Sequence, residues 1–311
     1  MFQIDGIVPI IPTPFAPDES IDFAELDSLI GFAIAARASA VCLPAYASEF
    51  YKLTEEERRA VVIHAITAAK GAVPVIAQVN APNLAAARAW SHELLDAGAE
   101  AVCTAAPRAV SLSEAALVEW YAAFLDAVPG PVIVQDYNPG GASLSVASLA
   151  RLHREHSNLR YVKLEDAMLA PKVTALLDAT SGELGVLEGW GGMYCMELAQ
   201  AGIAGIVPGL ALTDLLDRVF RLSRAGNLEQ ARPIFEAILP QIVYSLQSME
   251  LFHHAEKRLL QARGVLRSST VRRPTVALSA HEQAWIDELN RRILSLLGQE
   301  SVTLSEPPNH A

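Results

Sequence analysis

The chain contains few cysteines, and they are not arranged for metal binding. Its 311 residues include three, Cys42, Cys103 and Cys195, which lie far apart and lack the spacing of metal ligands. Such sparse usage is typical of a reduced, cytoplasmic protein and argues against a disulfide-stabilised secreted scaffold. The sequence therefore predicts neither a metal centre nor structural disulfides.

Positive charge and long apolar stretches are also scarce. The formal net charge of -11 and the isoelectric point near 5.2 argue against a nucleic-acid-binding protein, because such a protein would carry a basic face. No apolar run reaches the roughly 18 residues that span a bilayer. The N-terminal residues Met1–Asp5 lack the basic and apolar regions of a signal peptide. We therefore expect a soluble, cytoplasmic protein that contacts neither nucleic acid nor membrane.

What the sequence does contain is an alternation of short β-rich runs and longer amphipathic runs. The strand candidates are Ile7–Ile11, Ala40–Leu43, Val73–Val79, Ala101–Thr104, Val132–Asp136, Tyr161–Leu164, Leu184–Leu187 and Ile203–Val207. The helix candidates between them are Asp22–Ala36, Thr54–Lys70, Asn83–Ala97, Ser113–Ala127, Ser145–His156, Pro171–Ala179 and Gly192–Ala201. Repeated βα units of this kind predict an α/β fold, a (β/α)8 TIM barrel. An open, doubly wound sheet is the alternative, but residues 12–15 replace the glycine-rich turn that such a sheet needs.

Only helices are expected in the last third of the chain. Strand patterns end before residue 213, and the helical patterns that follow are Thr213–Ala225, Leu228–Leu251, Ala255–Arg263 and Ala280–Leu297. We expect residues 1–225 to form the barrel, 226–299 a C-terminal helical appendage and 300–311 a frayed polar tail. Two roles are open for the appendage: covering the barrel, or forming an oligomer interface.

One lysine of the chain lies in an unusual place. The lysines are five in number: Lys52, Lys70, Lys163, Lys172 and Lys257. Lys163 lies near the end of the mostly apolar run Asn158–Leu164, which predicts a buried strand. Burial disfavours an ammonium ion, so we expect Lys163 to lose its proton and attack a carbonyl substrate, forming a Schiff base. The alternative is a surface or ion-paired lysine near the strand end.

Two carboxylates are expected close to Lys163. The reactive groups of such barrels come from the C-terminal ends of the strands, and alternation along a strand places Glu165 on the same face as Lys163. Glu165 either holds a proton for the reaction or pairs with a charge. Asp136 ends the neighbouring strand, where it either acts as an acid or base or belongs to a turn.

Short motifs are spread along the chain in a specific order. They are Gly6–Pro9, Pro12–Phe15, Ser48-Glu49, Leu53–Arg58, Pro74–Ala77, Val162-Lys163, Gly189, Gly202–Ile206, Lys257 and Arg273-Pro274. Together, over roughly residues 4–298, they resemble the dihydrodipicolinate synthase / N-acetylneuraminate lyase superfamily of Schiff-base barrel enzymes. The resemblance implies a 2-keto acid substrate bound covalently to Lys163 without another cofactor. It also implies a homo-oligomer, a dimer or tetramer, although Arg108 and Ala109 replace the paired tyrosines of the family's dimer contact.

The chain departs from the synthases of that superfamily at several positions. Tyr46 stands in the place of the proton-relay threonine, and Gly141 in the place of the arginine that binds the second substrate. Alignment on Pro139 puts Asp136 in the slot of the tyrosine after strand five, and a bulge would be needed to restore Tyr137 to that slot. These differences argue against dihydrodipicolinate synthesis.

The 2-keto-3-deoxy-sugar-acid dehydratases of the superfamily, in particular those acting on L-2-keto-3-deoxyarabonate, resemble the chain more closely. They share the Ser-Glu pair at 48–49, the Gln-Asp pair at 135–136 and the Lys-x-Glu motif at 163–165. The resemblance implies that Lys163 attacks C2 of the keto acid and that the C4 hydroxyl leaves as water. Asp136 and Glu165 are then the candidate proton-handling groups.

The substrate itself is expected to bind at the same ends of the strands. The N–H groups of Ala47 and Ser48, with the Ser48 hydroxyl, are the candidates for holding its carboxylate. The other substrate-binding candidates are Tyr46, Tyr137, Gly189 and Val207. Three alternatives remain: an aldolase that cleaves the C3–C4 bond, a synthase-like condensing enzyme, and a barrel that binds keto acids without catalysis.

Overall fold

The strands form one sheet of parallel neighbours. The computed structural model describes residues 2–107, 111–137, 143–166 and 169–305 of the chain, with side chains up to residue 298. Within these residues the strands are β1 (Gly6–Ile7), β2 (Val41–Leu43), β3 (Val75–Gln78), β4 (Ala101–Thr104), β5 (Val132–Asp136), β6 (Leu159–Leu164), β7 (Gly185–Glu188) and β8 (Gly205–Ile206). Their order in the sheet is β1-β8-β7-β6-β5-β4-β3-β2.

The sheet closes on itself through the chain after β1. Ile10 forms parallel bridges to Cys42 of β2 and to Gly209 beyond β8, and thereby joins the two edges. The predicted (β/α)8 barrel is confirmed, and the open sheet is excluded. Strand β1 is shorter than the predicted Ile7–Ile11, and Pro9 contributes to this because it lacks the N–H group that a ladder uses.

A helix follows each strand, as the amphipathic patterns predict. The helices around the barrel are α1 (Phe23–Ala35), α2 (Glu55–Ala69), α3 (Leu84–Asp96), α4 (Glu114–Leu125), α5 (Val146–Glu155), α6 (Leu169–Ala179), α7 (Cys195–Ala201) and α8 (Thr213–Arg224). Several start signals are confirmed. At α2, Glu57 N donates to Thr54 Oγ1 at 3.1 Å and Thr54 N donates to Glu57 Oε2 at 2.9 Å, which completes a capping box.

Two hydrophobic layers follow from the alternation of side chains along the strands. On β5, Val132 and Val134 pack outward against the helices, whereas Ile133 packs inside the barrel. On β6, Val162 and Leu164 lie in the outer layer and Tyr161 in the inner one. Lys163 therefore projects into the barrel interior, where the sequence pattern places it.

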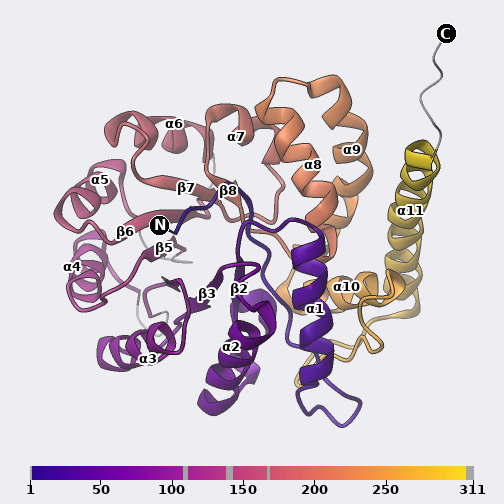
Figure 1. Ribbon diagram of the computed structural model, residues 1–311, viewed down its shortest axis with the longest axis horizontal. Helices are drawn as coiled ribbons and strands as arrows, with labels where there is room; N and C mark the ends of the chain where they lie inside the picture. The colour runs from indigo at the N-terminus through magenta and orange to yellow at the C-terminus, as the bar shows by residue number, and fades with distance from the viewer. Residues whose placement is uncertain (1, 108–110, 138–142, 167–168, 306–311) are drawn as a thin grey trace.

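The C-terminal region consists of α9 (Leu228–Ser245), α10 (Met249–Ala262) and α11 (Ala280–Ser305), which lie together at one side of the barrel (Figure 1). Two predicted boundaries are wrong. The expected helix Leu228–Leu251 ends at Ser245, because Ser248 accepts a hydrogen bond from Leu251 N at 3.2 Å and starts a new helix. Helix α11 continues past residue 299 to Ser305.

No helix in the described part of the chain is long and apolar enough to cross a membrane.

Candidate active site

A cavity of about 300 Å³ opens where the strands end. It is lined by most of the residues that the sequence nominates: Tyr46, Ala47, Tyr137, Lys163, Glu165, Gly189 and Val207. Two nominated residues, Ser48 and Asp136, do not line it. The barrel thus brings together side chains and backbone from five of its strands.

The amine of Lys163 and the carboxylate of Glu165 form an ion pair in this cavity. Lys163 Nζ lies 2.9 Å from Glu165 Oε1, and the two side chains are 10% and 12% exposed. They meet because Leu164, between them, packs into the outer layer and leaves its two neighbours on the inner face.

This ion pair decides the protonation state of Lys163. Burial lowers the pKa of the amine and is the largest single influence on it, but the carboxylate of Glu165, with smaller contributions from Cys103 and Cys42, raises the pKa of Lys163 above its ordinary value. The expectation that burial leaves Lys163 neutral is therefore wrong for the free protein. A nucleophilic amine forms only when the proton passes to an acceptor, and Glu165 is in contact to receive it.

Strand β5 contributes Gln135 and Tyr137 to the cavity. Gln135 pairs in register with Lys163 on β6, and both Gln135 and Tyr137 line the cavity. The pairing of β5 with β6 contains a register shift near its start. Tyr137 thus lines the cavity and Asp136 does not, although alignment on Pro139 puts Asp136 in the slot of the family's tyrosine after strand five.

Asp136 lies on the outer face of the barrel. Its Oδ2 is 2.7 Å from Lys172 Nζ on α6, and its Oδ1 accepts a hydrogen bond from Leu144 N at 3.1 Å. Burial raises the pKa of Asp136, although Lys172 opposes the shift. The expectation that Asp136 meets the substrate beside Lys163 does not fit this geometry, because successive residues of a strand point to opposite faces.

The loop after β2 forms a short 3₁₀ helix, η1 (Tyr46–Ser48), at the edge of the cavity. The Ser48 hydroxyl donates to Ile11 O at 2.6 Å and accepts from Ala45 N at 3.0 Å, while Ser48 N donates to Ala45 O at 2.9 Å. Ser48 therefore holds the loop together instead of facing a substrate carboxylate. Within the described residues the Ala47 N–H makes no hydrogen bond, so it remains as the candidate donor.

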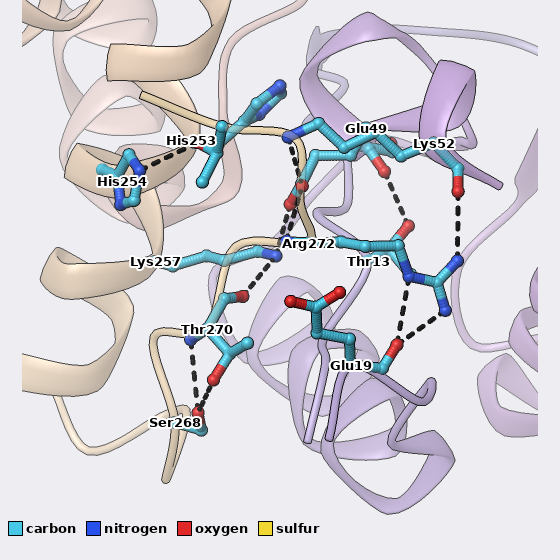
Figure 2. A network of polar contacts seen from close by, with 12 residues as sticks. Thr13, Glu19, Glu49, Lys52, His253, His254, Lys257, Ser268, Thr270 and Arg272 are labelled. Atoms are coloured by element: carbon cyan, nitrogen blue, oxygen red, sulfur yellow. Dashed lines mark hydrogen bonds and ion pairs between the residues drawn. The ribbon is translucent and has the colours of Figure 1, made fainter. Parts of the chain in front are cut away.

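A buried network ties the same loop to the C-terminal helices (Figure 2). Glu49 Oε1 lies 2.5 Å from Lys257 Nζ on α10, and Glu49 Oε2 lies 3.0 Å from Lys52 Nζ. Arg272 N also donates to Glu49 Oε2, at 3.2 Å. Burial lowers the pKa of Lys257 to about 8, although Glu49 opposes the shift. The appendage thus positions the loop that borders the cavity.

The turn between α9 and α10 lines the cavity through residues 246–248, and the start of α10 lines it through Met249 and Phe252. The sequence does not predict that this segment lines the cavity, because the predicted helix Leu228–Leu251 includes the residues that form the turn. Ser248 is the signal that could have located the break, since serine is a preferred residue before the first turn of a helix.

Glu188, at the end of β7, does not line the cavity but holds a turn that does. Its Oε2 accepts a hydrogen bond from Gly192 N at 2.9 Å, which holds the turn that carries Trp190. Glu188 Oε1 is buried and accepts no hydrogen bond from the described residues. Burial raises the pKa of Glu188 to about 7.

Several positions that matter for the sequence comparison lie outside the described residues: Arg108, Ala109, Pro139 and Gly141. In the described part of the chain, no group of three or more His, Cys, Asp or Glu side chains could hold a metal ion.

The chain matches known proteins along nearly its whole length. Residues 3–292 match the model of the dihydrodipicolinate synthetase family. An L-2-keto-3-deoxyarabonate dehydratase from Azospirillum brasilense is 28% identical, over 93% of this chain and 94% of the relative. A 4-hydroxy-tetrahydrodipicolinate synthase from Chlorobium luteolum is 29% identical, over 95% and 98% respectively.

A solved structure agrees with these sequence matches. The crystal structure of a dihydrodipicolinate synthase from Rhodopseudomonas palustris superposes with a TM-score of 0.86 at 27% identity, over 94% of this chain and 100% of that one. The family match covers well over half of the chain and includes every strand of the barrel. The protein belongs to the dihydrodipicolinate synthetase family, as a Schiff-base lyase that acts on keto acids.

Proposed function

We propose that the protein dehydrates a 2-keto-3-deoxy sugar acid through a Schiff base on Lys163. The observation that carries this proposal is the Lys163–Glu165 ion pair inside a cavity of about 300 Å³. An amine and a carboxylate in direct contact provide a nucleophile and a proton carrier at one place. The similarity to an L-2-keto-3-deoxyarabonate dehydratase over 93% of the chain supports the same reaction class.

The first step forms the Schiff base. Lys163 passes its proton to Glu165, and the neutral amine adds to the C2 carbonyl of the keto acid. Glu165 then returns this proton to the C2 oxygen and carries a second proton there from the nitrogen of Lys163, so that the oxygen leaves as water when the iminium forms. Glu165 is again a carboxylate at the end of this step.

The second step eliminates the C4 hydroxyl. The iminium acidifies C3, and Glu165 takes a proton from that carbon to give an enamine. The enamine then eliminates the C4 hydroxyl. Glu165 donates the proton that it took from C3 to this hydroxyl, which leaves as water. Hydrolysis of the unsaturated iminium by another water releases the product and restores the amine of Lys163.

The charges around the cavity disfavour a second anionic substrate. Among the described residues that line it, Lys163 is the only cation, and Tyr46 stands where a synthase carries a relay threonine. We assign the substrate carboxylate to the loop after β2, where the Ala47 N–H is available. The hydroxyl-bearing end of the substrate then extends toward the turn between α9 and α10.

Reduction by borohydride tests the proposal directly. The protein is treated with borohydride in the presence of pyruvate or of 2-keto-3-deoxy sugar acids with five or six carbons, and its intact mass and peptide map are measured. Product analysis without borohydride follows the same substrates. An adduct on Lys163, together with loss of one water from a sugar acid, supports the proposal.

Each other outcome contradicts a separate part of it. Release of pyruvate would identify an aldolase, and an adduct without turnover would identify a protein that only binds keto acids. No adduct with any keto acid would remove the Schiff base altogether. Fast condensation of pyruvate with aspartate semialdehyde, near 10 s⁻¹, would identify a synthase.

A further inference from the structure

A row of buried amides leads across the barrel to the Lys163–Glu165 pair. Gln78 at the end of β3 and Gln135 on β5 are 5% and 4% exposed. Gln78 Nε2 lies 3.2 Å from Gln135 Oε1, and Gln135 Nε2 lies 2.6 Å from Glu165 Oε1. The hydrogen bonds therefore run from β3 through β5 to the residue that follows β6.

The carboxylate of Glu165 dictates which way each amide points. An ionised carboxylate only accepts hydrogen bonds, so Gln135 must turn its NH₂ group toward Glu165. Its carbonyl oxygen then faces Gln78, which must donate in turn. Gln78 Nε2 also donates to Asn80 Oδ1 at 3.0 Å, so both of its N–H groups are used.

Gln135 and Lys163 both donate to the same carboxylate oxygen of Glu165. Oε1 receives the hydrogen bond from Gln135 and lies 2.9 Å from Lys163 Nζ. Oε2 accepts no hydrogen bond from the described residues. A carboxylate held in this way presents one fixed oxygen to the amine and leaves the other for a proton from elsewhere.

We propose that Gln135 is a positioning residue for Glu165 and that Gln78 acts through Gln135. The amide row holds the carboxylate of Glu165 with Oε1 on Lys163 and Oε2 directed to the C3 proton of the substrate. This inference rests on the proposed function, in which Glu165 carries that proton.

The variant Gln135→Met tests this role, because methionine keeps the length of the side chain and removes the donor. We expect kcat to fall roughly 10- to 100-fold, the effect of losing one hydrogen bond to a charged group. KM and the final extent of borohydride trapping should change little, since the ion pair with Lys163 still holds Glu165 where it can take the proton of the amine.

The variant Gln78→Met tests whether the amides act in series. It should lower kcat by less than Gln135→Met does, because Gln78 only orients Gln135. The double variant should match Gln135→Met alone, since Gln78 has no route to Glu165 once Gln135 is gone. This failure of additivity is what a relay predicts and two independent effects do not.

Gln241→Met is the matched control. Gln241 on α9 is also 4% exposed but lies outside the cavity around Lys163. Its replacement should leave kcat and KM unchanged, which shows that the loss of a buried amide elsewhere in the protein does not by itself lower kcat. Circular dichroism and thermal melting check that each variant is folded, and Gln135→Asn, too short to reach Glu165, replaces Gln135→Met if that variant does not fold.

Three results would overturn the inference. An unchanged kcat in a folded Gln135→Met variant would remove the positioning role. A rise in KM alone would make Gln135 a substrate ligand, and additive losses in the double variant would break the link to Gln78. Failure of the wild-type protein to trap any keto acid is a separate result, because it refutes the proposed function and not the amide row.

Discussion

The side chain of Lys163 and the backbone of Gly189 lie in such close contact that no side chain fits between them. A Cβ added at Gly189 would lie 3.0 Å from Lys163 Cε, 2.8 Å from Leu164 O and 2.4 Å from Glu165 Cγ. Gly189 N also donates to Leu164 O at 2.9 Å, which fixes this approach. The geometry of the ion pair therefore depends on the absence of a side chain at the end of β7.

Gly189→Ala should displace Lys163 and Glu165 and lower kcat at least tenfold, because positioning errors of about 1 Å cost that much or more. Gly31→Ala is the control, since a Cβ at Gly31 in α1 meets nothing within 4 Å. Alanine there should be neutral or stabilise the fold by about 0.5–1 kcal/mol. Steady-state kinetics and thermal melting measure both. Full activity in Gly189→Ala would show that the pair tolerates movement.

Lys163→Ala should abolish turnover and borohydride trapping together, because no other described lysine lines the cavity. Lys163→Arg should be equally inactive, since a guanidinium stays protonated and cannot attack a carbonyl. Intact mass after reduction measures trapping. An adduct in either variant would move the Schiff base to another residue.

Asp136→Asn should leave kcat within about threefold of wild type while it lowers the melting temperature. The physical reason is its outward position, where it pairs with Lys172 at 2.7 Å and is buried. Tyr137→Phe is the matched comparison, because Tyr137 lines the cavity and its hydroxyl can contact the substrate. Kinetics and melting are measured for both. A tenfold loss of kcat in a fully stable Asp136→Asn would return Asp136 to the chemical step.

Glu49→Gln should destabilise the protein by about 3–5 kcal/mol, because it leaves the buried Lys257 ammonium without a carboxylate partner. Combining it with Lys257→Met should cost less than the sum of the two single changes. Glu155→Gln, at a half-exposed pair with Arg151, is the control and should cost about 0.5 kcal/mol or less. Denaturant unfolding measures all four. Equal small losses at both sites would show that the Glu49 network contributes little.

Glu188 should make stability fall as the pH rises from about 5 to 7. Burial raises the pKa of Glu188 from 4.5 to about 7, so in this window the folded state binds a proton that the unfolded state has released. Below it both states are protonated, and above it the folded state bears a buried charge at a cost of roughly 2–4 kcal/mol.

Glu188→Gln should remove this part of the pH dependence and be more stable than wild type at pH 8, because the amide oxygen still accepts from Gly192 N. Urea unfolding between pH 5 and 8 measures the difference. Burial also raises the pKa of Glu256 to about 7. Because Glu256 is present in both proteins, the stability of Glu188→Gln should still fall with rising pH, but less steeply than that of the wild type. Identical slopes in the two proteins would contradict the assignment to Glu188.

Much of the site could be predicted from the sequence, because it depends on local patterns. Alternation along one strand places Glu165 with Lys163, and the order of strands and helices predicts a barrel whose strand ends meet. The same order of elements places Tyr137, Gly189 and Val207 at the C-terminal ends of the strands, where they line one cavity. These inferences need only the period of each element and the topology.

Only the tertiary structure decided which groups meet and in what protonation state. The folded strand β5 places Gln135 inward and therefore Asp136 outward, and the contact with Glu165 contributes to raising the pKa of Lys163 although burial lowers it. The amide row joins Gln78, Gln135 and Glu165, which are 57 and 30 residues apart in the chain. Contacts at such separations arise only when the barrel closes, because no local pattern encodes which inward side chains then face each other.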